Sequence, residues 1–175
     1  ASYPTSYIPT YGSSVTRSND AMSNLTTTSL LSQTTNNTIF GEVTNFKEQA
    51  GNARFVTLFG SSLSNNDRVL FYSSHAGSTY SLALQYKTSG ASDVQITLGG
   101  LSYNEKVKFA AVFSGTEMSF FVNGSLVGSS TIVAANNFYY YAPTNVANDL
   151  AFKMHQVSFY PTALTDSECI ALTTL

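Results

Sequence analysis

Charged side chains are scarce in this chain, and their scarcity sets the first limits on its function. Asp, Glu, Lys and Arg make up 10% of the 175 residues, against about 25% in ordinary soluble domains. The basic residues are scattered and the net charge is −2. Because nucleic-acid binding requires a clustered basic face that neutralises phosphates, we expect no nucleic-acid partner.

Three further absences narrow the function. A single cysteine, Cys169, excludes an internal disulfide and a metal site built from several cysteines. No apolar run approaches the ~18–20 residues that cross a bilayer, so no membrane insertion is expected, and the first residues lack the order of a secretory signal. Tryptophan, the usual platform for a sugar ring, is absent, which leaves that role to tyrosine.

What the chain does contain is short runs of alternating polar and apolar residues. Hydrophobic residues make up 43% of the sequence, which indicates one globular domain. Breaks rich in Gly, Ser and Asn separate the runs at the intervals typical of an all-β sandwich. The sequence therefore predicts two packed antiparallel sheets. The expected strands cover 38–46, 54–59, 68–73, 80–88, 94–98, 106–114, 118–122, 125–129 and 151–160.

Two local motifs add detail near the C-terminus. Asn123-Gly124 lies between two apolar-rich runs and predicts a type I′ hairpin turn, because both positions tolerate positive φ. Thr165 and Glu168 fit a capping box, which predicts the start of one short helix. Cys169 would lie on the apolar side of that helix, as a buried structural thiol rather than a nucleophile.

Four other expectations concern single positions. In the run 38–46 both faces are partly apolar, which predicts a strand packed on both sides or a bulge at Gly41. Gly99-Gly100 is expected to form a turn at the end of a strand. His75 lies in a turn-like Ser-Ser-His-Ala-Gly stretch and is expected to be exposed, whereas His155 is expected on a face of the last strand.

Two blocks in the C-terminal part carry a resemblance to a known superfamily. Residues 109–124 (FAAVFSGTEMSFFVNG) resemble a strand and hairpin of concanavalin A-like or laminin G-like jelly rolls. Residues 154–168 (MHQVSFYPTALTDSE) resemble the closing strand and helical turn of the same domains. The resemblance implies an all-β fold, a two-sheet antiparallel jelly-roll sandwich with a short C-terminal helix, over residues 21–175.

The preceding segment, residues 1–20, is expected to be a linker or junction between modules. Pro4 and Pro9 hold the chain extended, and Gly12-Ser13-Ser14 loosens it again. We therefore expect the domain to be one module of a larger protein.

The same segment resembles one found in phage proteins. Residues 6–10 (SYIPT), followed by 15–17 (VTR) and Asp20, are similar to a segment that joins lectin-like modules in phage virion and tail-appendage proteins. The resemblance implies a place on the phage particle, other virion modules as partners and, as one assembly, a homotrimer. The alternative location is extracellular or at a bacterial cell surface.

Glycoside hydrolysis is also found on this fold, but the sequence argues against it. Such catalysis needs two carboxylic acids that face one sugar. Asp166 and Glu168 belong to the helix cap, and the other acidic candidates are isolated: Glu42, Glu48, Glu105 and Glu117. We therefore expect a non-enzymatic module.

Tyrosine and asparagine supply the candidates for contact with a glycan or with another subunit. Consecutive tyrosines at 139–141 cannot all point inward on a strand, so at least one should be exposed. The candidates are Tyr72, Tyr80, Asn136, Asn137, Tyr139, Tyr140 and Tyr141. Glycan contact and subunit packing remain open alternatives for them.

Calcium is the one cofactor that the laminin G-like resemblance suggests, bound by oxygen atoms at an edge of the sandwich. Asp67, Asn66 and Asp149 are the candidate ligands. The alternative is that these residues form turns.

The sequence leads to one functional hypothesis and two alternatives. The first is a non-enzymatic lectin-like module of a phage virion or tail appendage, which serves attachment to cell-surface polysaccharide, subunit assembly, or both. The second is a carbohydrate-binding module of a bacterial secreted or surface polysaccharide-degrading enzyme. A free-standing glycanase is the third.

Overall fold

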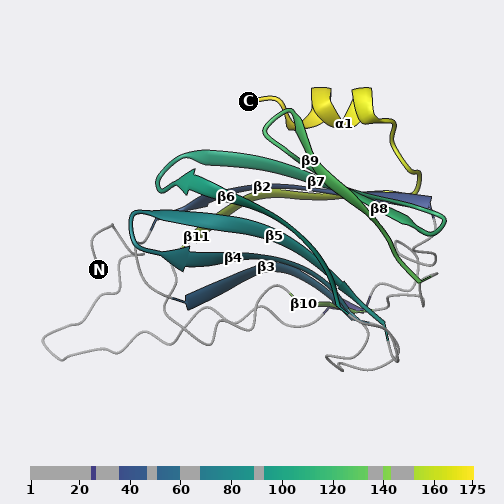
Figure 1. The fold of residues 1–175 in the computed structure, drawn as a ribbon, viewed down its shortest axis with the longest axis horizontal. Helices are drawn as coiled ribbons and strands as arrows, with labels where there is room; N and C mark the ends of the chain where they lie inside the picture. Colours follow the sequence, from purple (N-terminus) through teal and green to yellow (C-terminus); the bar gives the residue numbers. More distant parts are fainter. Residues whose placement is uncertain are drawn as a thin grey trace, which may run out of the picture.

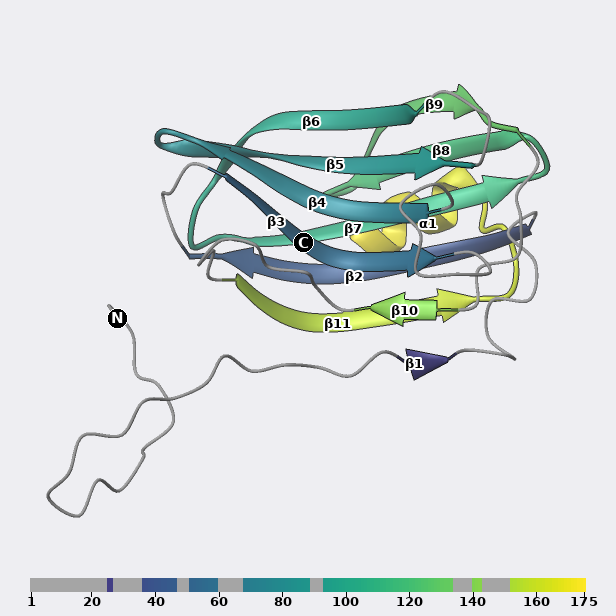
Figure 2. The ribbon, with the colours of Figure 1, turned by 90° about the horizontal axis from the view of Figure 1, so that it is seen from below.

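The described part of the chain forms two antiparallel β-sheets, with one short helix outside them (Figure 1). The computed structural model describes residues 25–26, 36–46, 51–59, 68–88, 93–133, 140–142 and 152–175. Within these ranges the six-stranded sheet has the order β1-β10-β3-β4-β5-β6 and the five-stranded sheet has the order β11-β2-β7-β8-β9. Figure 2 shows the two layers from a second direction.

Nine strands coincide with the alternating runs of the sequence, although β3, β4 and β6 extend beyond these runs, and β1 and β10 were not predicted. The six-stranded sheet contains β1 (Leu25–Thr26), β10 (Tyr140–Ala142), β3 (Gly51–Phe59), β4 (Arg68–Ala76), β5 (Thr79–Lys87) and β6 (Val94–Ser102). The five-stranded sheet contains β11 (Phe152–Tyr160), β2 (Asn36–Asn45), β7 (Lys106–Ser114), β8 (Glu117–Val122) and β9 (Ser125–Thr131). The predicted sandwich of two antiparallel sheets with a short C-terminal helix is therefore confirmed.

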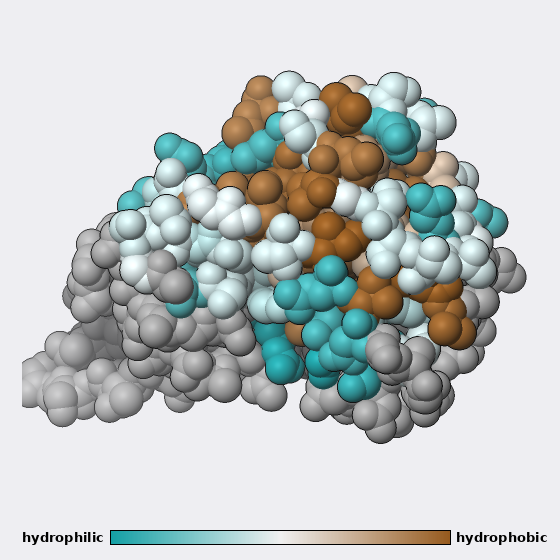
Figure 3. Space-filling model, viewed as in Figure 1, coloured by the Kyte–Doolittle hydropathy of each residue, from teal (hydrophilic) through white to brown (hydrophobic). Residues whose placement is uncertain are grey.

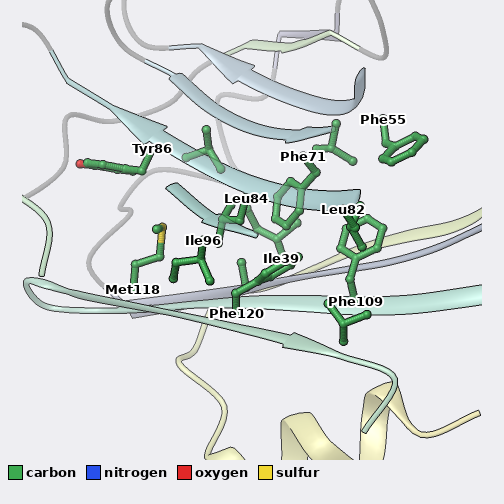
Figure 4. Packing of buried hydrophobic residues seen from close by; sticks show 14 of the residues in the cluster. Ile39, Phe55, Phe71, Leu82, Leu84, Tyr86, Ile96, Phe109, Met118 and Phe120 are labelled. Atoms are coloured by element: carbon green, nitrogen blue, oxygen red, sulfur yellow. The ribbon is translucent and has the colours of Figure 1, made fainter. Parts of the chain in front are cut away.

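Aromatic side chains fill the space between the sheets (Figure 4). Phe71 from β4 lies 4.9 Å from Phe109 and 6.2 Å from Phe120, measured between ring centroids. All three rings are 0% exposed, so β4, β7 and β8 are joined across the interior by one column of rings. Each such aromatic pair adds about 0.5–1.5 kcal/mol beyond the burial of its surface.

Gly41 makes room for this column. It lies opposite Phe109 in the β2–β7 pairing, and a Cβ atom at Gly41 would overlap the Phe109 ring. The pairing runs from Asn36 to Thr44 without a shift of register. The alternative of a bulge at Gly41 was therefore wrong. The other alternative is confirmed: β2 is packed on both sides, because consecutive residues of the strand are buried.

Bulges occur at four other places, where the register of a strand pair shifts. The additional residues are Phe55 in β3, Val127 in β9 and His155 in β11, together with Gly99-Gly100 in β6. Gly100 has φ +78°, which glycine adopts without strain. The prediction of a turn at Gly99-Gly100 was wrong, because both residues lie inside β6.

The helix α1 (Asp166–Thr173) covers the outer face of the five-stranded sheet near β7, β8 and β9 (Figure 1). Its capping box is confirmed: Thr165 Oγ1 accepts from the amide of Glu168, and the Thr165 amide donates to Glu168 Oε2 at 2.8 Å. The predicted hairpin turn is also confirmed, with φ 47° at Asn123 and 78° at Gly124. No helix within the described ranges is long and apolar enough to cross a membrane.

Cys169 lies on the buried side of α1, and its thiol should be unreactive in the folded protein. It packs with Ala110, Val112 and Phe121, and burial, with smaller effects from Asp166 and Glu168, raises the pKa of the thiol to about 11. Because thiolate is the reactive species, we expect iodoacetamide at pH 8 to label Cys169 only after unfolding in guanidinium. Equal labelling rates for folded and unfolded protein would show that this face of the helix opens readily.

Candidate functional site

The outer face of the six-stranded sheet, across β4, β5 and β6, carries a hydrogen-bonded set of polar side chains. Tyr72 lies opposite Ala83, which lies opposite Thr97, so these residues form one row across three strands. Gln85 and Gln95 form the neighbouring pair on the same face. We call this set, with its charged members, the outer polar face: Arg54, Arg68, Tyr72, Gln85, Lys87, Asp93, Gln95 and Thr97.

Tyr72 lies across the sheet instead of standing away from it. Its hydroxyl donates to Gln95 Oε1 at 2.8 Å, so the side chain of a β4 residue reaches β6. It must pass over β5, where Ala83 offers only a methyl group beneath it. Tyr72 is half-buried in this position.

Partial burial also affects the Tyr72 hydroxyl. Desolvation raises the pKa of this phenol above its ordinary value, while the positive charge of Arg68 opposes the shift. The hydroxyl therefore remains protonated at neutral pH and stays a hydrogen-bond donor to Gln95.

A second chain of hydrogen bonds fixes the rest of the outer polar face. Arg68 donates from Nε and Nη2 to Gln85 Oε1, at 3.1 and 2.8 Å. Gln85 Nε2 donates to Asp93 Oδ2 at 3.2 Å, and Lys87 Nζ lies 3.0 Å from Asp93 Oδ1. Because both glutamine amides are oriented by neighbours, their remaining donors and acceptors point in defined directions.

Only part of the outer face of this sheet is accessible to a ligand. Thr57 of β3 and Leu70 of β4 are cross-strand partners at outward-facing positions, yet they are only 2% and 4% exposed. The hydrogen bonds of Tyr72 with Gln95, and of Gln95 Nε2 with Thr97 Oγ1 at 2.9 Å, are exposed. The part open to a ligand therefore lies around Tyr72, Gln95 and Thr97.

An apolar band adjoins this face at the side of the sandwich. Figure 3 shows apolar side chains gathered between β6 and β9, with hydrophilic ones on the six-stranded sheet beside them. Val94, Leu98 and Val127 are partly buried against the core there.

The structure separates the predicted site residues into four groups, of which buried Tyr80 is the last. Tyr72 lies at the surface, so its role as a contact residue stays a prediction. Tyr140 and Tyr141 lie in β10, which pairs through its backbone with β1 and β3. Residues outside the described ranges are Asn136, Asn137, Tyr139 and the calcium candidates Asn66, Asp67 and Asp149.

Tyr80 was a wrong prediction. It is 1% exposed and faces the core, where its ring lies 5.6 Å from His75 and 5.5 Å from Tyr103. A side chain at this depth cannot contact a surface ligand.

The prediction for His75 was also wrong. It lies in β4, is 4% exposed, and its Nε2 lies 2.5 Å from Ser73 Oγ. Its ring stacks with those of Tyr80 and Tyr103, at 5.6 and 5.5 Å, and the three rings form a triangle because the two tyrosines are 5.5 Å apart. These aromatic neighbours extend β4 beyond the predicted end of the run, so that the turn begins only at Gly77. His155, as expected, lies on a sheet face, with Nε2 3.0 Å from Thr44 Oγ1.

Glu42, which forms an ion pair with Lys106, is poorly suited to acid–base catalysis. Glu42 Oε1 lies 2.7 Å from Lys106 Nζ, and this hydrogen bond is the main reason that the pKa of Glu42 is lowered. The other charges that act on it, those of His155 and Lys108, also lower the pKa. Such a carboxylate stays ionised and does not serve as a general acid at neutral pH. Within the described residues, no group of three or more His, Cys, Asp or Glu side chains could hold a metal ion.

Sequence reasoning missed most of the outer polar face. Arg68, Gln85 and Gln95 were not singled out, although alternation places Arg68 on the same face as Tyr72. What the sequence does not contain is the register that brings Gln95 of β6 within reach of a β4 tyrosine.

Comparison with known families identifies this architecture. The model of the concanavalin A-like lectin/glucanases superfamily matches residues 19–169 of the chain. No curated protein matches the chain significantly in sequence.

Several solved structures share the fold. The CBM40 of the Ruminococcus gnavus IT-sialidase superposes with a TM-score of 0.61 at 17% identity, over 81% of this chain and 84% of that one. A native heptameric SAP-like pentraxin from Limulus polyphemus gives 0.59 at 15% identity, over 88% of this chain and 76% of that one. The leech intramolecular trans-sialidase superposes with a TM-score of 0.62 at 14% identity. The match covers 82% of this chain but only 24% of that one. At these identities the likeness concerns the fold.

Proposed function

The chain belongs to the concanavalin A-like lectin/glucanase superfamily, and on that premise we propose that it is a non-catalytic glycan-binding module. The outer polar face is its contact surface. The observation that carries this proposal is the Tyr72 ring, held across Ala83 by its hydrogen bond to Gln95. Sugar rings pack their C–H faces on flat aromatic surfaces, and their hydroxyls need fixed donors and acceptors beside the ring.

The surroundings of Tyr72 meet the second requirement. Gln95 and Thr97 lie on one side of the ring, hydrogen-bonded to each other at 2.9 Å, and Gln85 lies next to Gln95. Because these side chains are already ordered, a bound sugar costs little additional side-chain entropy. The solved structures that share the fold include a carbohydrate-binding module, the Ruminococcus gnavus CBM40, which supports the same function.

Replacing the aromatic ring should therefore weaken glycan binding. We expect Tyr72→Ala to reduce the affinity for the best glycan of an array about tenfold, a loss in the range of one aromatic contact. Tyr72→Phe should have a smaller effect, because it keeps the ring and loses only the hydroxyl that anchors it. Isothermal titration calorimetry measures both affinities.

Tyr160→Ala is the matched control for this experiment. Tyr160 is a half-buried tyrosine of β11 in the other sheet, so its loss should leave affinity unchanged. An unchanged affinity in Tyr72→Ala would remove the outer polar face from the proposal. If the wild-type protein binds no glycan on the array, with or without calcium, the recognition function fails and a structural function in assembly gains.

For the biological setting we propose a phage virion or tail appendage. The support is the resemblance of residues 6–10 and 15–17 to the segment that joins modules in such proteins. The alternative is a carbohydrate-binding module of a bacterial polysaccharide-degrading enzyme, which the likeness to the Ruminococcus gnavus module favours. Antibodies against the domain should label purified phage particles in the first case and a secreted or surface enzyme in the second.

A further inference from the structure

We propose that the ligand of the outer polar face is an acidic glycan, whose anionic groups bind to Arg54 and Arg68. This inference rests on the proposed glycan-binding function and narrows the ligand class. It follows from the distribution of charge on this face, which differs from that of the whole chain.

The face carries an excess of positive charge. Among the described residues its cations are Arg54, Arg68 and Lys87, and its carboxylate is Asp93, whereas the whole chain has a net charge of −2. Asp93 is already paired with Lys87 at 3.0 Å. Among the residues that the structure describes, no carboxylate forms an ion pair with either arginine.

The placement of Arg68 has a cost for folding. It is the direct cross-strand partner of Lys87, and like charges at such positions destabilise a sheet. Its own hydrogen bonds go to the neutral amide of Gln85, and no carboxylate among the described residues pairs with it. A binding partner that brings negative charge would offset this repulsion.

Arg68 also keeps hydrogen-bonding capacity. A guanidinium has five N–H donors, and the two bonds to Gln85 use Nε and one Nη2 donor. The remaining donors can bind a carboxylate, sulfate or phosphate group, the anions that suit the planar fork of arginine. The bonds to Gln85 hold the fork in place before the ligand arrives.

Arg54 is placed to act together with the aromatic ring. It is the cross-strand partner of Tyr72 on the same face of the sheet, at a spacing of about 5 Å between Cβ atoms. A sugar stacked on Tyr72 would therefore have Arg54 on its β3 side and Gln95 with Thr97 on its β6 side. Arg68, four residues before Tyr72 in the same strand, lies farther along β4.

The direct test compares acidic glycans with matched neutral forms. The probes are polygalacturonate, hyaluronate and polysialic acid, each beside its carboxyl-reduced form, and dextran sulfate beside dextran. We expect at least tenfold tighter binding of one acidic polymer than of its neutral twin, and the two polymer types separate carboxylate from sulfate recognition. The preference should decrease as salt is raised, because salt screens attraction between charges that water can reach.

Three variants separate a specific site from general attraction of a polyanion. Arg54→Gln and Arg68→Gln should each weaken binding of the acidic polymer roughly tenfold, the smaller end of the range for a hydrogen bond to a charged group. Binding of neutral glycans should weaken less than binding of the acidic polymer, because only the acidic polymer loses a contact between opposite charges. Lys153→Gln, which removes one positive charge from exposed Lys153 on the other sheet, should change neither.

The outcomes distinguish this inference from the function on which it rests. Equal binding of acidic and neutral twins, with Tyr72→Ala still impaired, overturns the acidic preference and leaves the glycan-binding function standing. An equal loss in Lys153→Gln and in the arginine variants also overturns it, because the attraction would then be unspecific. Binding to none of these polymers and to no glycan of the array overturns both.

Discussion

Gly41→Ala is expected to lower the free energy of unfolding by about 2–3 kcal/mol, the usual cost of overpacking a core. The additional methyl group would overlap the ring of Phe109, which is 0% exposed and packed against Phe71 at 4.9 Å. Strand propensity alone predicts the opposite sign, because glycine inside a strand costs roughly 0.5–1 kcal/mol relative to alanine. Steric overlap is the larger effect. Urea denaturation followed by tyrosine fluorescence measures the difference.

Gly99→Ala is the matched control. Gly99 also lies inside a strand, but it is exposed, and a Cβ atom there would meet only Ser81 Oγ at 3.4 Å. The free energy of unfolding of the Gly99→Ala protein should differ from that of the wild type by less than about 0.5 kcal/mol. If Gly41→Ala is as stable as the wild-type protein, the Phe109 ring has room to move and the column of rings is less rigid than described.

Phe71→Ala should have the largest effect of any substitution considered, a loss of about 3–5 kcal/mol. Phe71 is 0% exposed, and its ring touches both Phe109 and Phe120. Removal leaves a cavity between the sheets, and total stabilities are only about 5–15 kcal/mol. Leu126→Ala, at a residue that is 47% exposed, should cost less than about 0.5 kcal/mol in the same assay. A loss below 1 kcal/mol in Phe71→Ala would mean that the core collapses into the space.

The two core substitutions should interact. In the Phe71→Ala protein the Phe109 ring can shift into the cavity, which relieves its overlap with a methyl group at Gly41. The double variant should therefore be more stable than the sum of the single losses predicts. Strictly additive losses would contradict the view that Gly41, Phe109 and Phe71 form one packed unit.

Phe71 and Tyr72 show how one strand serves both the core and the surface. Consecutive residues of a strand point to opposite faces, so Phe71 enters the column of rings while Tyr72 lies on the outer polar face. Substitutions of Phe71 are thus expected to disturb the proposed contact surface through β4. For this reason binding experiments should use surface variants and not core variants.

The strands could be predicted because their signals are local. The run 106–114 alternates and agrees with β7, and the Asn123-Gly124 turn and the Thr165 capping box depend on residues adjacent in sequence. The burial of His75 depends instead on Tyr80 and on Tyr103 from another part of the chain. A polar stretch with no local apolar pattern was therefore taken for a turn.

The candidate site was predictable only in part. Tyr72 was identified, but its partner Gln95 depends on the register of two strand pairs. Tyr80 was an avoidable error, since alternation along β5 already places it on the same face as Leu82 and Leu84. The arginines were missed because the sequence does not show which residues lie beside them. Arg54 is the cross-strand partner of Tyr72, and Arg68 that of Lys87, only in the register of the folded sheet.

The bulges have a consequence for behaviour at high concentration. Within the described strands, three of the four that terminate the two sheets, β6, β9 and β11, each contain a bulge. A regular, unpaired strand edge is a template on which further strands add, and a bulge interrupts this template by twisting the edge. We therefore expect the folded domain to resist growth into fibrils by edge-to-edge addition, even where many copies are crowded together.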